Sequence, residues 1–148
     1  MSTEQLGRPA EILLAEDNPG DVRRTHEALK EAGVQSRLHV VPDGVETMAF
    51  LLSHGAYANA PRPDLILLDL NIPRMDGREV LKQVKGDENL RRIPVVVVTS
   101  SQAEEDIREA YALRANCYVT NPVDLDQFMK VMKGVWEFWL TVVKLPPQ

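Results

Sequence analysis

Five short runs of apolar residues recur along the chain, and a segment with helical character follows each of them. The runs cover residues 11–15, 36–41, 64–68, 94–98 and 116–120. Continuously apolar runs of this length are typical of parallel strands that are buried on both faces of a sheet. Parallel strands need long crossover connections, which a helix usually provides. The pattern therefore predicts an open, five-stranded parallel α/β sheet with right-handed crossovers.

Cap and turn residues mark the helices between the runs. Asn18 and Pro19 predict an N-cap followed by a first-turn proline, and Gly33 predicts the end of that helix. Ser101 and Glu104 form a capping-box pattern before the fourth helix. The five expected helices cover residues 19–32, 45–55, 78–85, 104–113 and 124–143.

Length and composition indicate one globular domain without a membrane segment. The 148 residues are 44% hydrophobic, and the net charge of −5 disfavours general binding to nucleic acid or to an anionic membrane. The single cysteine, Cys117, cannot form an internal disulfide, which favours a reducing compartment. No apolar run approaches the roughly 18 residues of a membrane span, and the start of the chain lacks signal-peptide features. We expect a cytoplasmic protein with a flexible N-terminus (residues 1–10), a single domain (residues 11–143) and a short tail (residues 144–148).

Acidic residues directly follow two of the predicted strands. Glu16 and Asp17 come after the first run, and Asp69 comes after the third. Ligands of open parallel sheets bind at the carboxyl ends of the strands. Three carboxylates at this edge repel one another unless a cation neutralises them, so at least one pKa should be raised without metal. A small set of oxygen ligands suits Mg²⁺, and Asn71 lies where its backbone carbonyl completes the set.

Helix capping is the simpler explanation for any one of these acids. Asp17 alone fits an N-cap as well as it fits a metal ligand. The three acids together with Thr99, which follows the fourth strand, instead favour a binding site. A carboxylate beside Mg²⁺ is a known type of phosphoryl acceptor, and the Thr99 hydroxyl is placed to donate to a phosphoryl oxygen.

Together these motifs resemble the receiver domain of two-component response regulators. The resemblance rests on Glu16-Asp17, on LILLDLNIPRMDG, on Thr99-Ser100 after PVVVV and on a residue–proline pair after the fifth strand. It spans residues 11–142. The segments PRPDLILLDLN, DGREVLK, RRIPVVVVTSS, NCYVT and FWL…LP are similar to the small stand-alone response regulators that partner bacterial phytochromes. The resemblance implies a flavodoxin-like, doubly wound (βα)5 fold with strand order 2-1-3-4-5.

The family resemblance also implies a role for each residue of the cluster. Asp69 would accept a phosphoryl group from a phosphohistidine of a sensor histidine kinase of the phytochrome type. Glu16 and Asp17 would hold Mg²⁺, directly or through water, together with Asp69 and the Asn71 carbonyl, and Thr99 would be the switch hydroxyl. The chain would then be a phosphoacceptor switch rather than a metabolic enzyme, and would signal through protein contacts.

One position departs from the family pattern. The family has lysine before the proline that follows the fifth strand, and this chain has Asn121. Asparagine can donate a hydrogen bond but carries no charge, so it is a weaker partner for a phosphoryl group. Tyr118, three residues earlier, matches the aromatic switch position. We expect Asp69 still to accept a phosphoryl group and the conformational response to phosphorylation to be weaker. We also expect the Asn121–Pro122 bond to be cis, as in the family.

Three other functions fit parts of the pattern. A pseudo-receiver, which binds partners without switching on phosphorylation, is supported by Asn121 alone. A haloacid-dehalogenase-type phosphatase needs a second acid two residues after its nucleophile, where this chain has Asn71. A flavodoxin-like electron carrier needs a phosphate loop rich in hydroxyls and glycine, where residues 16–21 read EDNPGD. A receiver therefore remains the leading interpretation.

Two apolar stripes run along the expected last helix. The first comprises Leu125, Phe128, Met132, Trp136, Trp139 and Val143. The second comprises Val131, Val135, Phe138 and Val142. One stripe is enough to cover a sheet, so the second predicts a self-complementary surface in a two-fold homodimer. The other possibility is that a neighbouring helix or residues 145–147 cover it.

Overall fold

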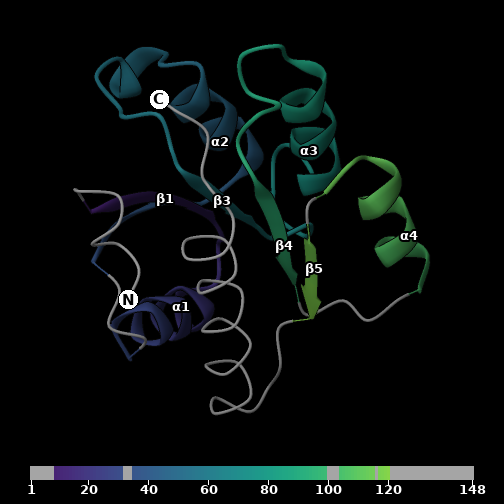
Figure 1. Cartoon of the computed structure of the whole chain (residues 1–148), viewed down its shortest axis with the longest axis horizontal. Helices are drawn as coiled ribbons and strands as arrows, with labels where there is room; N and C mark the ends of the chain where they lie inside the picture. Colours follow the sequence, from purple (N-terminus) through teal and green to yellow (C-terminus); the bar gives the residue numbers. More distant parts are fainter. Residues whose placement is uncertain (1–8, 32–34, 100–103, 116, 121–148) are drawn as a thin grey trace.

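The computed structural model describes residues 9–31, 35–99, 104–115 and 117–120, which contain a five-stranded parallel sheet (Figure 1). The order of its strands across the sheet is β2-β1-β3-β4-β5, as predicted. The strands are β1 (Ala10–Ala15), β2 (Ser36–Val41), β3 (Leu65–Leu68), β4 (Val95–Thr99) and β5 (Cys117–Thr120). The order reverses at β1, so the carboxyl ends of β1 and β3 border the crevice where ligands of such sheets bind.

Asx caps define the starts of three helices. The Asn18 carboxamide accepts a hydrogen bond from the Asp21 amide at 3.0 Å, which confirms the predicted cap. The Asp43 and Asp76 carboxylates do the same for the second and third helices. The helices are α1 (Pro19–Glu31), α2 (Gly44–Leu51), α3 (Gly77–Gly86) and α4 (Glu104–Ala112), with a short 3-10 helix, η2 (Gly55–Tyr57). The expected last helix (residues 124–143) and Ser101 lie outside the described residues.

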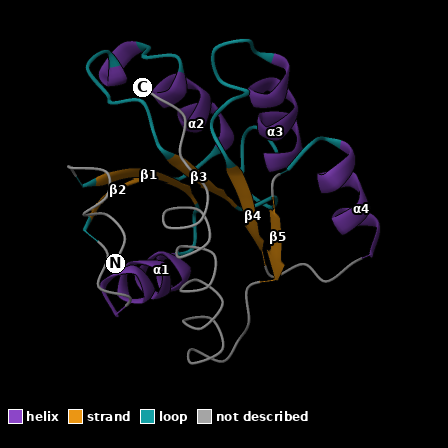
Figure 2. Cartoon of the chain, in the orientation of Figure 1, coloured by secondary structure: helices purple, strands orange, loops and turns teal. Residues whose placement is uncertain are grey.

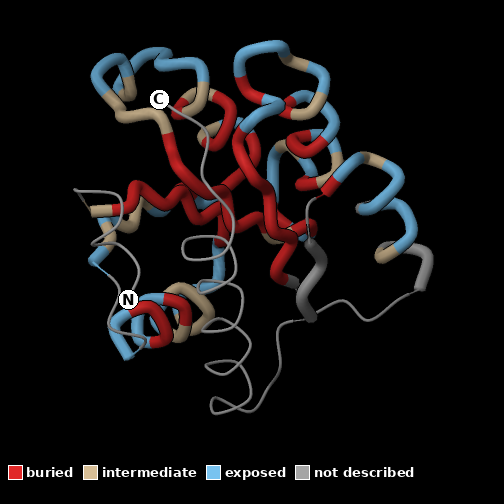
Figure 3. The backbone as a smooth tube through the Cα atoms, viewed as in Figure 1, coloured by how far each residue is buried: buried red, intermediate tan, exposed pale blue. Residues whose placement is uncertain are grey.

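Helices cover both faces of the sheet. Figures 1 and 2 show α2 and α3 together on one face and α1 on the other. Leu13 and Ile66 belong to the core that the sheet shares with α2 and α3. Their neighbours Ile12 and Leu65 point the opposite way and are equally inaccessible, because successive side chains of a strand alternate between faces. Burial therefore runs unbroken along the central strands (Figure 3), which explains their continuously apolar sequences.

The second helix is shorter than its sequence pattern predicts. The amphipathic stretch 45–55 contains α2 only as far as Leu51, and η2 begins at Gly55. Ser53 and Gly55 adopt left-handed backbone conformations, with φ of 57° and 58°. A left-handed residue ends an α-helix, so the chain turns here although the apolar periodicity continues. None of the helices in the described part of the chain combines the length and hydropathy needed to cross a membrane.

Candidate functional site

The ends of β1 and β3 bring the predicted acidic residues together. Ala15 and Leu68 are paired at the ends of these neighbouring strands, so the residues that follow them are adjacent. The Asp69 amide donates to the Ala15 carbonyl at 3.1 Å, and the Glu16 amide donates to the Val41 carbonyl of β2 at 3.0 Å. The hydrogen-bond ladder thus continues for one residue beyond each strand and fixes the backbone from which both carboxylates project.

Glu16, Asp17 and Asp69 form one carboxylate cluster. One carboxylate oxygen from each residue lies within 4.8 Å of the other two. Glu16 is buried, with 5% of its surface exposed, whereas Asp69 is half-buried and Asp17 is exposed. No lysine or arginine among the described residues forms an ion pair with the cluster. The concentrated negative charge and mixed exposure suit a divalent cation that keeps some of its water.

The metal-free cluster retains a proton on Glu16. Burial raises the pKa of this carboxyl from 4.5 to about 8, and the negative charge of Asp69 adds to the shift. The Asn18 amide, which donates to Glu16 Oε2 at 3.1 Å, offsets part of it by favouring the ionised form. The predicted raised pKa within the cluster is therefore confirmed, and the structure assigns it to Glu16.

Asp17 does not serve as the cap of α1. The neighbouring residue, Asn18, makes the capping hydrogen bond to Asp21. The capping explanation therefore fails for Asp17, whose carboxylate instead belongs to the cluster with Glu16 and Asp69.

The loop between β3 and α3 is packed directly against the backbone of Asp69. The Asn71 amide donates to Asp69 Oδ1 at 3.0 Å, which orients that carboxylate. A Cβ atom on Gly77 would lie 2.4 Å from the Asp69 carbonyl oxygen, so no larger residue fits without moving the loop. The Asp76-Gly77 pair at the start of α3 is the sequence signal for this contact, and sequence reasoning assigned it no role.

The same loop is also anchored to the start of α2. The Gly44 amide donates to the Pro73 carbonyl at 3.2 Å, and an Arg74 guanidinium nitrogen lies 3.1 Å from the Asp43 carboxylate. Asp43 is buried and also caps α2 through the Glu46 amide. Sequence reasoning missed this anchor because its residues lie about 30 positions apart and carry no shared motif.

The remaining predicted site residues lie at or beyond the limit of the described part. Thr99 is the last residue of β4, and Tyr118 lies on the adjacent β5, where the structure describes their backbone. Asn121, with the predicted cis bond to Pro122, lies outside the described residues. So do the residues of the second apolar stripe, Val131, Val135, Phe138 and Val142.

Comparison with known proteins identifies relatives that cover almost the whole chain. The family described as the response regulator receiver domain matches residues 12–133. The response regulator Rcp1 of Synechocystis is 45% identical over 144 residues, which are 97% of this chain and 98% of Rcp1. A probable methanogenesis regulatory protein, FilR2 of Methanothrix harundinacea, is 37% identical and covers 89% of this chain and 84% of its own.

Solved structures show the same fold at high similarity. The phosphorylated cyanobacterial phytochrome response regulator RcpA superimposes with a TM-score of 0.90 at 49% identity, over 95% of this chain and all of RcpA. The Mn²⁺-bound form of Rcp1 gives a TM-score of 0.88 at 47% identity, over 94% of this chain and all of that chain. The bacteriophytochrome response regulator AtBRR gives 0.74 at 42% identity, over 89% and 96% of the two chains.

Proposed function

Because the chain belongs to the response regulator receiver family, whose members are phosphoacceptor switches rather than enzymes, we propose that Asp69 is its phosphoryl acceptor. The carboxylate cluster carries this proposal. Asp69 directly follows the central strand β3 and lies beside Glu16 and Asp17. The related RcpA, 49% identical, has been crystallised in a phosphorylated form.

We assign Mg²⁺ to the cluster, held by Glu16, Asp17, Asp69 and the backbone carbonyl of Asn71. The fit rests on three carboxylates within 4.8 Å of one another and on a Glu16 pKa that a bound cation would lower. The related Rcp1 binds Mn²⁺, which also prefers oxygen ligands. When bound there, the cation would supply positive charge that offsets the carboxylates and the charge of an incoming phosphoryl group.

In the proposed reaction the Asp69 carboxylate attacks the phosphorus of a phosphohistidine on the kinase. The new P–O bond forms as the P–N bond breaks, and the imidazole leaves with a proton from solvent. The Asn71 amide, which donates to Asp69 Oδ1, holds the carboxylate in one orientation for this attack. The Thr99 hydroxyl would donate to a phosphoryl oxygen, and Tyr118 would change its exposure. Asn121 would contribute a neutral hydrogen bond where the family has a lysine.

The proposed partner is a sensor histidine kinase of the phytochrome type. Relatives at 42–49% identity include RcpA and AtBRR, which are response regulators of a phytochrome and a bacteriophytochrome. A second copy of the chain is the other proposed partner, through the stripe of Val131, Val135, Phe138 and Val142.

Intact-mass measurement after incubation with a small-molecule phosphodonor and Mg²⁺ tests the acceptor. The wild type should gain one phosphoryl group, and Asp69→Asn should gain none. Glu88→Gln removes an exposed acid on the loop after α3 and serves as a control that should label like the wild type. Stoichiometric labelling of Asp69→Asn would refute the assignment. An unlabelled wild type would instead favour the pseudo-receiver suggested by Asn121.

A further inference from the structure

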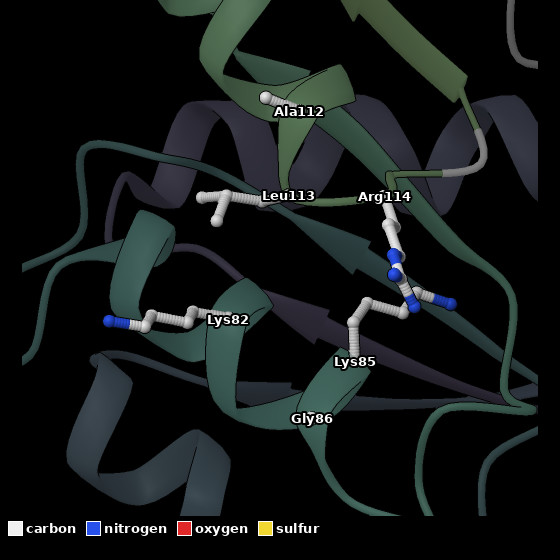
Figure 4. A pocket seen from close by; sticks show the side chains of 6 residues that line it. All are labelled: Lys82, Lys85, Gly86, Ala112, Leu113 and Arg114. Atoms are coloured by element: carbon white, nitrogen blue, oxygen red, sulfur yellow. The ribbon is translucent and has the colours of Figure 1, made fainter.

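A cavity of about 290 Å³ lies between the last turn of α3 and the end of α4 (Figure 4). Its lining comprises Lys82, Lys85, Gly86, Ala112, Leu113 and Arg114. The cavity lies at the amino ends of β4 and β5, because α3 and α4 both finish there before the chain enters these strands. It is therefore at the opposite edge of the sheet from the carboxylate cluster.

The charge of the cavity is strongly positive on a chain whose net charge is −5. Three of its lining residues are cationic and none is acidic. Asp87 accepts hydrogen bonds from the Asn89 and Leu90 amides, and Glu109 pairs with Arg78, so neither carboxylate lines the cavity. The carboxyl ends of α3 and α4 each contribute roughly half a negative charge. The three lining cations and the two helix ends together thus carry a charge of about +2.

Arg114 occupies an unusual backbone conformation for a cationic residue. Its φ is 72°, in the left-handed region where a helix ends and where glycine or asparagine is normally found. Its side chain forms no ion pair with another described residue, and Figure 4 shows it directed toward Lys85. A non-glycine residue held in this region is more common at ligand sites than elsewhere.

Lys85 is fixed on the other side of the cavity. Its ammonium donates to the Arg91 carbonyl at 3.2 Å and to the Ile93 carbonyl at 3.0 Å. Burial lowers the pKa of this ammonium to about 8, so an anion beside it would stabilise its charged form. The side chain is thus a positioned charge rather than a freely moving surface lysine.

We propose that this cavity binds a small phosphate monoester, with its phosphate between Lys85 and Arg114. A phosphate monoester carries −1.5 to −2 charges at neutral pH, which balances the charge of about +2. The apolar part of the ligand would contact Ala112 and Leu113. The volume lies just below the ~300–1,000 Å³ typical of small-molecule sites, so the ligand we propose is as small as a sugar phosphate. A single phosphorylated side chain of a protein would fill only part of it.

Amide NMR spectra of the full chain without Mg²⁺ provide the test, with inorganic phosphate, ribose 5-phosphate and ribose as probes. Both phosphates should cause saturable shifts at the amides of residues 85–86 and 113–114, and ribose should cause none. Ribose 5-phosphate should bind more tightly than inorganic phosphate because it also contacts the apolar wall. Arg114→Gln should weaken binding by about tenfold, through loss of a charge-assisted hydrogen bond. Arg114→Lys should restore part of the loss.

Arg92→Gln is the matched control, since it removes an exposed arginine of the nearby loop that does not line the cavity. It should leave the affinity within about twofold, as expected for an exposed charge near the site. Non-saturating shifts in the wild type, or equal affinity in Arg114→Gln, would overturn the proposal. Binding of a phosphoserine peptide but not of ribose 5-phosphate would overturn it as well. The test requires no phosphorylation of Asp69, so its failure leaves the proposed function untouched.

Discussion

Glu16→Gln should change how the stability of the metal-free protein depends on pH. Burial and the Asp69 charge raise the pKa of Glu16 from 4.5 in the unfolded chain to about 8 in the folded one. Between these two values the folded protein holds a proton that the unfolded chain has released. The free energy of unfolding should therefore fall as the pH rises through this window, and should level off above pH 8. A glutamine at this position cannot titrate and removes this loss.

The expected magnitude follows from one proton. A full proton difference between the two states changes the free energy of unfolding by ~1.4 kcal/mol per pH unit. Between pH 5 and pH 7.5 this gives roughly 3 kcal/mol as an upper limit. Small movements of the Asp69 carboxylate and entry of water reduce it, so we expect about 1–3 kcal/mol.

Urea denaturation followed by far-ultraviolet circular dichroism measures the difference. Wild type and Glu16→Gln are compared at several pH values from 5 to 8 in the presence of a chelator. The stability advantage of the glutamine variant should grow with pH, and Mg²⁺ should reduce it in favour of the wild type. If the free energies of unfolding of the two proteins change with pH in the same way in the presence of the chelator, the argument that Glu16 holds the proton is refuted.

Four further outcomes can be checked separately. Asp17→Asn should weaken Mg²⁺ binding, measured by calorimetry, and an unchanged titration would count against the proposed site. Gly77→Ala should destabilise the fold by about 1–3 kcal/mol in urea because its Cβ would overlap a backbone carbonyl, whereas Gly86→Ala, with open space around it, should cost nothing. Phe138→Asp should convert a homodimer to a folded monomer in sedimentation, and a monomeric wild type at tens of micromolar would refute the dimer. Asn121→Lys should enlarge the backbone shifts caused by beryllofluoride, and equal shifts in the wild type would show that the coupling does not depend on this position.

The positions of the strands could be predicted because the buried central strands consist almost entirely of apolar residues. Every residue of β3 is apolar, since both faces of that strand are covered. The edge strand β2 has a neighbouring strand on one side only, and its residues Arg37 and Val40 are exposed. The end of α2 was not predictable in the same way. The apolar pattern continues past Leu51, whereas the left-handed turn at Ser53 depends on how the chain packs afterwards.

The acid cluster was predictable for a topological reason. In a parallel sheet the residues that follow each strand meet at one edge, so local sequence positions are enough to bring Glu16 and Asp69 together. No such rule predicts from the sequence which loops contact one another. The Arg74–Asp43 ion pair depends on the loop after β3 crossing to the start of α2, and it could be found only in three dimensions. The cationic cavity belongs to the same class, since Lys85 lies on α3 and Arg114 follows α4, about 30 residues later.

The choice of Glu16 as the protonated member of the cluster shows what the structure adds. The sequence predicts only that neighbouring carboxylates repel and that one of them should have a raised pKa. Burial decides which one, and burial depends on the last hydrogen bond of the ladder. The Glu16 amide still pairs with the Val41 carbonyl, so its side chain starts inside the edge of the sheet and is 5% exposed. Asp17, one residue later, is exposed to water. A shift of one residue along the chain therefore separates the carboxyl that keeps a proton from the carboxylate that is free to meet a hydrated cation.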